Sequence, residues 1–244
     1  MAQDWLTVGL REMLARLPRP QFAPSLIFDF EHVQRAIAIV EGAITQEQAR
    51  TQLEHQQAAA KAAQDPFHNY IENPVFAPMA ASLWNAEMTF PMILRRSLLI
   101  AVSSHVEHAL RSWCRLLHDE WNLAEVGKRS PGCSDLQHLM IYLADVSKLA
   151  LADYETWPEW LRIDAYRVAR NCLAHDGGII DTDGKRAAIE TLPQIEVEES
   201  GLLMGEPMVH LLPGACEAAA DAAQTFFGRL THVCQQDPRV PKDA

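Results

Sequence analysis

The sequence predicts a mainly α-helical protein with one small β-hairpin before its last helix. Over most of the chain, apolar residues recur at intervals of three and four, which is the period of one helix face. Only between residues 189 and 212 do apolar and polar residues alternate, as they do in half-buried strands. Hydrophobic residues make up 48% and charged residues 22% of the chain, which excludes a disordered chain, a collagen-like chain and a simple coiled coil.

Residues 1–78 are expected to form a helical N-terminal extension. The apolar spacing predicts helices over 2–17 and 26–42. A further helix is expected over 46–64, and its apolar face consists almost only of alanine. Because such a face has little to bury, we expect this helix to project or to pack on a partner.

Two breaks are expected within this extension. Thr45, with Gln48 three residues later, has the capping-box pattern that begins a new helix. Residues 65–78 combine prolines with aromatic residues, which predicts an irregular linker and the main domain boundary. The alternative is a long loop packed on a single domain.

The rest of the chain is expected to form one helical domain over 79–235, followed by a loose tail over 236–244. Pro91 suits the first turn of a long helix that continues to residue 119. Ser134 is the expected N-cap of the next helix, which ends near Leu151.

The last elements have clear ends in the sequence. Pro158 lies near the start of a helix that runs to about His175, where one of the glycines Gly177 and Gly178 can take the left-handed cap. One face of this helix collects its apolar residues: Leu161, Ala165, Val168, Ala169 and Cys172. A hairpin over 189–212 and a final helix over 215–235 complete the domain.

Charge and hydropathy restrict the protein's environment and partners. No segment approaches the ~20 apolar residues that cross a bilayer. Asp4 lies where a signal peptide would carry positive charge, so we expect a cytoplasmic protein without a membrane partner. Five widely spaced cysteines without a CxxC pair favour reduced thiols. A net charge of −11 repels nucleic acid at long range, so any such function needs a local basic surface or a site built by assembly.

Residues 166–178 carry the most informative pattern. Asn171 and His175 lie one helical turn apart on one flank, whereas Arg170 lies about 140° from His175 around an ideal helix. Arginine binds phosphate through a planar fork, and histidine exchanges a proton near neutral pH. These groups suit metal-independent RNA cleavage, in which the ribose 2′-hydroxyl attacks the next phosphate. The segment 160–175 also contains three arginines and only one acidic residue, which makes it a small positive patch in an acidic chain. These arginines are Arg162, Arg167 and Arg170.

The run from Arg170 through Asn171 to His175 resembles the signature of the HEPN superfamily. In that signature an arginine, often followed by a polar residue, precedes a histidine by four to six positions. The helical core, the two glycines after the motif and the insertion before the last helix also resemble the family, over about residues 88–235. The resemblance implies a HEPN-like bundle that dimerises through the motif helix. In many members this bundle is a metal-independent endoribonuclease of toxin–antitoxin, phage-defence or RNA-processing systems.

The resemblance also implies roles for the motif residues. Arg170 would hold the scissile phosphate, and His175 would act as a general acid or base or would orient the 2′-hydroxyl. Asn171 would bind a phosphate or fix His175. The implied partners are RNA, a second copy of the chain and, for a toxin, an antitoxin protein. No metal and no cofactor is implied.

Further substrate contacts are expected around the motif. Arg167 lies beside Arg170 on the same helix. In the family an earlier helix often carries polar residues that face the motif, and Ser104 and Glu107 occupy a suitable place, as do His105 and His108. Glu107 could pair with Arg170. A solvated helix face is the alternative for all four.

Two other interpretations remain open. Four residues could form a tetrahedral zinc site if their helices met: Cys114, His118, Cys172 and His175. Alternatively, the chain is a catalytically inactive helical interaction or nucleotide-binding module, in which the motif residues stabilise the bundle. The exposure of Arg170 and His175 distinguishes the ribonuclease from this inactive module, because a ribonuclease needs both side chains open to a cleft, whereas a structural role would leave them enclosed.

Overall fold

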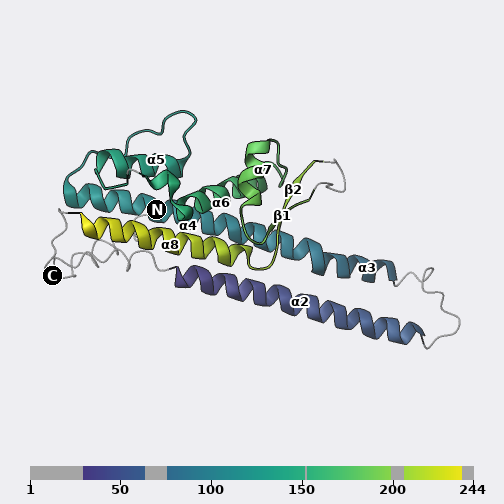
Figure 1. Ribbon diagram of the computed structural model, residues 1–244. Helices are drawn as coiled ribbons and strands as arrows, with labels where there is room; N and C mark the ends of the chain where they lie inside the picture. The colour runs from purple at the N-terminus through teal and green to yellow at the C-terminus, as the bar shows by residue number, and fades with distance from the viewer. Residues whose placement is uncertain (1–29, 64–75, 152, 199–205, 238–244) are drawn as a thin grey trace. The chain divides into compact units, whose positions relative to one another are not determined.

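The computed structural model describes residues 30–63, 76–151, 153–198 and 206–237. These residues are mainly helical and contain one antiparallel pair of strands before the last helix (Figure 1), which confirms the predicted fold class. The helix expected over 2–17, most of the expected linker and nearly all of the expected tail lie outside the described residues. The domain boundary at 65–78 therefore stays a prediction.

The elements follow one another along the chain as follows: α2 (Glu31–Ala63), α3 (Phe76–Trp84), the π-helix η2 (Asn85–Thr89), α4 (Phe90–Trp121), α5 (Asp135–Ile141), the π-helix η3 (Tyr142–Val146), the 3₁₀-helix η4 (Tyr154–Thr156), α6 (Pro158–His175), α7 (Asp183–Glu190), β1 (Ile195–Glu198), β2 (Met208–Leu211) and α8 (Ala215–Gln236). The described residues form two compact parts. The first part holds the described residues within 109–154 and 224–237, and the second part holds those within 30–108 and 155–223. None of the helices in the described ranges has both the length and the apolar character that a membrane span requires.

A single helix, α2, replaces the two that were expected over 26–42 and 46–64. Thr45 is not an N-cap, because its hydroxyl donates to the Glu41 carbonyl 2.9 Å away, one turn earlier in the same helix. A threonine in a helix interior can satisfy its hydroxyl in this way. Buried residues recur at seven-residue spacing on both sides of Thr45: Phe30, Ile37, Ile44 and Thr51. Their continuous buried face keeps α2 in one piece.

Pro91 does not begin the long helix. The helices α3, η2 and α4 follow each other without a break, and Pro91 is the second residue of α4. Proline has no N–H and crowds the carbonyl four residues earlier, so a regular helix does not tolerate it in its interior. Here the π-turn comes just before it, with the Phe90 N–H bonded to the Asn85 carbonyl five residues earlier. The wider turn lets the helix continue through the proline.

The first part is organised around the buried residues of α4 and α5. Ser134 caps α5 in a complete capping box with Gln137, as predicted. The helix ends earlier than expected, because α5 gives way to the π-helix η3 and helical structure stops before Ser147. The buried thiol of Cys114 donates to the Leu139 carbonyl, with Sγ and O 3.7 Å apart.

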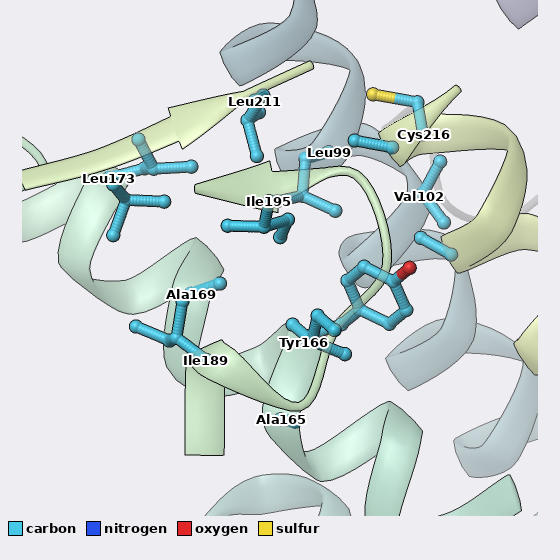
Figure 2. Packing of buried hydrophobic residues seen from close by; sticks show 14 of the residues in the cluster. Leu99, Val102, Ala165, Tyr166, Ala169, Leu173, Ile189, Ile195, Leu211 and Cys216 are labelled. Carbon is cyan, nitrogen blue, oxygen red and sulfur yellow. The ribbon is translucent and has the colours of Figure 1, made fainter. Parts of the chain in front are cut away.

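The second part has a core built from α2, α4, α6, α7, the hairpin and α8. Figure 2 shows residues of this core from every one of these elements except α2. The hairpin pairs Ile195 with Leu211, and both side chains are buried in this core, as the alternating pattern predicts. The helix α7 was not predicted. It begins at the N-cap Thr182, whose hydroxyl accepts from the Lys185 N–H, and it buries Ile189.

Candidate functional site

The helix α6 carries the predicted motif, and both of its ends are as the sequence predicts. Pro158 occupies the first helical position after Trp157, whose backbone is extended. At the other end Gly177 has φ +67°, a left-handed conformation that glycine adopts without a Cβ penalty. The N–H groups of Asp176 and Gly178 both donate to the Cys172 carbonyl, at 3.0 and 2.8 Å. These bonds fix the end of the helix directly after His175.

Arg170 is half-buried, and its hydrogen-bonding capacity is only partly used. Its Nη1 donates to Asn171 Oδ1 at 2.9 Å. Its Nε is buried and has no hydrogen-bond partner among the described residues. A guanidinium carries five N–H donors, and a buried donor without an acceptor is unfavourable. The side chain is therefore suited to an additional acceptor such as a phosphate oxygen.

His175 is the last residue of α6, and its side chain is exposed. Asn171, one turn earlier, bonds to Arg170 rather than to His175. Within the described residues, no hydrogen bond or ion pair joins His175 to either of them. The structure thus brings Arg170 and Asn171 together and leaves His175 free at the end of the helix.

The residues expected to make further substrate contacts do not join Arg170 in one hydrogen-bonded cluster within the described residues. Arg167 Nε lies 2.7 Å from Asp164 Oδ1, so its charge is balanced one turn earlier on the same helix. Ser104 is exposed on α4, and its hydroxyl donates to the Ile100 carbonyl at 2.8 Å. Glu107 is half-buried on α4, and the described residues contain no ion pair between it and Arg170.

Acidic residues that follow the motif are also compensated. Lys185 Nζ lies 3.3 Å from Asp176 Oδ2 and 2.8 Å from Asp181 Oδ1. The hydrogen bond to Lys185 lowers the pKa of Asp181, and the same bond raises the pKa of Lys185. These pairs reduce the negative potential beside His175.

Tyr166 is a residue of this helix to which sequence reasoning assigned no role. It lies one turn before Arg170, its ring is buried, and its hydroxyl has no hydrogen-bond partner among the described residues. Burial is the main reason that the pKa of Tyr166 is raised, so the phenol stays protonated. Tyr166 and Arg170 therefore leave two unsatisfied polar groups on one flank of α6. The spacing of four residues between Tyr166 and Arg170 is the sequence signal that could have placed Tyr166 beside the motif.

His105, on α4, has an environment that makes stability depend on pH. Its ring packs edge-on against Phe30, with centroids 5.0 Å apart, and its buried Nε2 has no hydrogen-bond partner in the described structure. Burial, and then the nearby His108, lower the pKa of His105 below its usual range. In the unfolded chain the imidazole titrates near pH ~6.5.

We therefore expect the free energy of unfolding to fall as pH decreases from about 7.5 to 5.5. Above the unfolded pKa the imidazole is neutral in both states, and below it the unfolded chain binds the proton more readily. Urea titrations at several pH values measure this effect. His105→Gln should flatten the dependence and His108→Gln should preserve most of it, because burial is the larger cause. An unchanged profile in His105→Gln would contradict this assignment.

The zinc alternative receives no support from the described residues, in which no three histidine, cysteine or acidic side chains are grouped to hold a metal ion. Cys114 is fully buried, and burial raises the pKa of its thiol to about 12. Burial also raises the pKa of Cys172. Zinc binds the thiolate, and both environments disfavour that form.

Gly177, just past the motif, is one of the residues that line a pocket of about 730 Å³, but none of the predicted site residues lines it. Comparison of the chain with protein-family models, with curated proteins and with solved structures found no match.

Proposed function

We propose that this chain is a metal-independent endoribonuclease of the HEPN type. The observation that supports the proposal most is the state of Arg170, whose half-buried guanidinium bonds Asn171 and keeps Nε without a protein acceptor. It shares one helix with His175, which is exposed. A purely structural role would leave both side chains enclosed and fully paired.

The reaction needs two proton transfers and one stabilised charge. A base takes the proton of the ribose 2′-hydroxyl, the new O2′–P bond forms, and the P–O5′ bond breaks as an acid protonates O5′. The products are a 2′,3′-cyclic phosphate and a 5′-hydroxyl. His175 serves as the acid or the base, and Arg170, held by Asn171, stabilises the negative charge that develops on the phosphate oxygens.

The proposed enzyme is a homodimer with α6 at the interface. On one helix Arg170 and His175 lie about 140° apart, so one copy does not present both groups to the same phosphate. A second copy could supply the missing group. Leu161, with 56% of its surface exposed, lies within about 40° of His175 around an ideal helix and offers an apolar contact for that copy.

The first experiment compares RNA cleavage by wild type, Arg170→Ala and His175→Ala in the presence of a metal chelator. We expect each variant to lose activity by at least about 100-fold while its melting temperature is retained. Arg162→Ala is the matched control, because Arg162 is an exposed arginine of the same helix. Equal cleavage by all four proteins would remove the catalytic assignment, and cleavage that requires a divalent metal would refute the mechanism.

A mixing experiment tests whether the two groups come from different subunits. Arg170→Ala and His175→Ala are each inactive in the proposed dimer. Mixed after dissociation, they form heterodimers in which one intact Arg170 meets one intact His175 of the other copy. Recovery of cleavage supports the shared site, whereas inactivity of purified heterodimers would contradict it.

The cellular proposal follows the resemblance. As a toxin or phage-defence effector with an antitoxin protein as its partner, the chain should arrest growth when it is expressed alone. Arrest should disappear in His175→Ala. If wild type neither cleaves RNA nor arrests growth, the inactive interaction or nucleotide-binding module becomes the better assignment.

A further inference from the structure

Exposed apolar side chains are concentrated around the π-helix η2. Among the described residues, five of the nine large apolar side chains that are exposed lie between residues 84 and 93. Three of them are spaced by four along the chain: Trp84, Met88 and Met92. A contiguous apolar surface of this kind marks an interaction site more often than scattered single residues do.

These three residues form one wall of a groove of about 730 Å³ in the second part of the structure. Residues of the hairpin and of the turn that follows it form another wall: Met208, Leu211, Leu212 and Pro213. We call this the hairpin groove. Methionine side chains are flexible and polarisable, and they adapt to differently shaped apolar partners.

The rim of the hairpin groove is acidic. Glu87, Glu198 and Glu206 line it, and Glu198 Oε2 lies 2.7 Å from His210 Nε2. Glu87 and Glu206 have no ionic partner among the described residues. The one arginine in the lining, Arg95, is already paired with Glu41. The groove therefore attracts positive charge, and the unpaired Glu87 and Glu206 disfavour an anionic ligand there.

The geometry of the hairpin favours a helical occupant over an added strand. The first half of the outer edge of β2 is already used, because the Val209 N–H donates to the Gly178 carbonyl at 2.9 Å. The Ile180 N–H likewise donates to the Pro207 carbonyl at 2.9 Å. Backbone pairing thus already occupies β2 next to Gly178, and the groove is lined by apolar and acidic side chains, which is the surface an amphipathic helix recognises.

We propose that the hairpin groove binds a basic amphipathic helix of a partner protein. Its apolar face would contact Trp84, Met88 and Met92, and its lysines or arginines would lie against Glu87 and Glu206. This assignment is independent of the ribonuclease proposal, because it uses none of the motif residues.

The test measures binding of the full chain to a labelled peptide by fluorescence anisotropy. The probe is a synthetic helix of about 18 residues with leucines along one face and lysines elsewhere. We expect Trp84→Ala or Met88→Ala to weaken binding at least about tenfold. Ile39→Ala is the matched control, because Ile39 is exposed outside the groove and its loss should leave binding unchanged.

Charge is tested separately with a peptide in which glutamate replaces every lysine. We expect this peptide to bind at least about tenfold more weakly than the lysine peptide. Glu87→Gln should reduce the difference in affinity between the two peptides. Glu120→Gln is the control, because Glu120 is an exposed glutamate outside the groove, and it should leave the difference unchanged. Equal affinity for the two peptides would overturn the proposal. So would binding that survives both apolar substitutions, or a groove that takes up a neutral apolar dye but neither peptide.

Discussion

Replacing Glu41 with glutamine is expected to lower the free energy of unfolding by about 3–5 kcal/mol, the range for breaking a buried ion pair. Arg95 and Glu41 form a two-pronged pair in the second part, with Nε–Oε1 and Nη2–Oε2 distances of 2.7 and 2.8 Å. Only 9% of the arginine side chain and 15% of the glutamate side chain are exposed. Without the carboxylate, a nearly buried guanidinium keeps its charge and loses its acceptor.

Denaturant titrations measure this loss, and the same helix provides the control. Glu47 pairs with Arg50 on α2, but both side chains are exposed to solvent, so Glu47→Gln should cost far less than Glu41→Gln. The double variant Glu41→Leu with Arg95→Met should be less destabilised than Glu41→Gln, because it removes both charges. A cost for Glu41→Gln as small as that of Glu47→Gln would show that the pair contributes little.

Replacing Leu99 with alanine is expected to cost about 2–5 kcal/mol, the range for a buried leucine that leaves a cavity. Leu99 is fully buried in α4 and belongs to the core cluster with Val102, Ile195 and Leu211 (Figure 2). These neighbours come from α4 and both strands, so they cannot all move inward to fill the space. Thermal and denaturant unfolding of purified Leu99→Ala measure the loss.

The matched control is Leu161→Ala in α6. Leu161 was expected on the buried face of that helix, but 56% of it is exposed. At protein concentrations low enough for the chain to be monomeric, its replacement should change stability by no more than about 0.5 kcal/mol. If Leu161→Ala were as costly as Leu99→Ala, the side chain would have to be covered in solution, as the proposed α6 dimer requires at high protein concentration. Unfolding measurements at two protein concentrations distinguish a monomer, whose stability does not depend on concentration, from a dimer that covers Leu161.

Features with local causes were predictable from the sequence. Pro158 and Gly177 mark the ends of α6, the pair Ser134 and Gln137 marks the start of α5, and alternation marks the hairpin. Each of these signals acts within one or two turns of backbone. The same local signals misled at Thr45, where a capping pattern lies inside α2, and at Pro91, where a π-turn admits a proline.

The candidate site was predictable only as a set of residues. Spacing places Arg170, Asn171 and His175 on one helix, and the structure agrees. Spacing does not reveal that Asn171 bonds to Arg170 or that Arg167 is balanced by Asp164. Those choices depend on side-chain rotamers and on burial, which the periodicity of one helix leaves open.

The sequence by itself determined the mainly helical class, the ends of the motif helix and the position of the hairpin, because caps, turns and hydrophobic period act over a few residues. Only the tertiary structure decided that Glu41 meets Arg95, 54 residues later, and that α3, η2 and the hairpin enclose an acidic groove. Ion pairs and grooves form between segments that are distant along the chain. Their energies depend on desolvation and packing, which exist only after those segments come together.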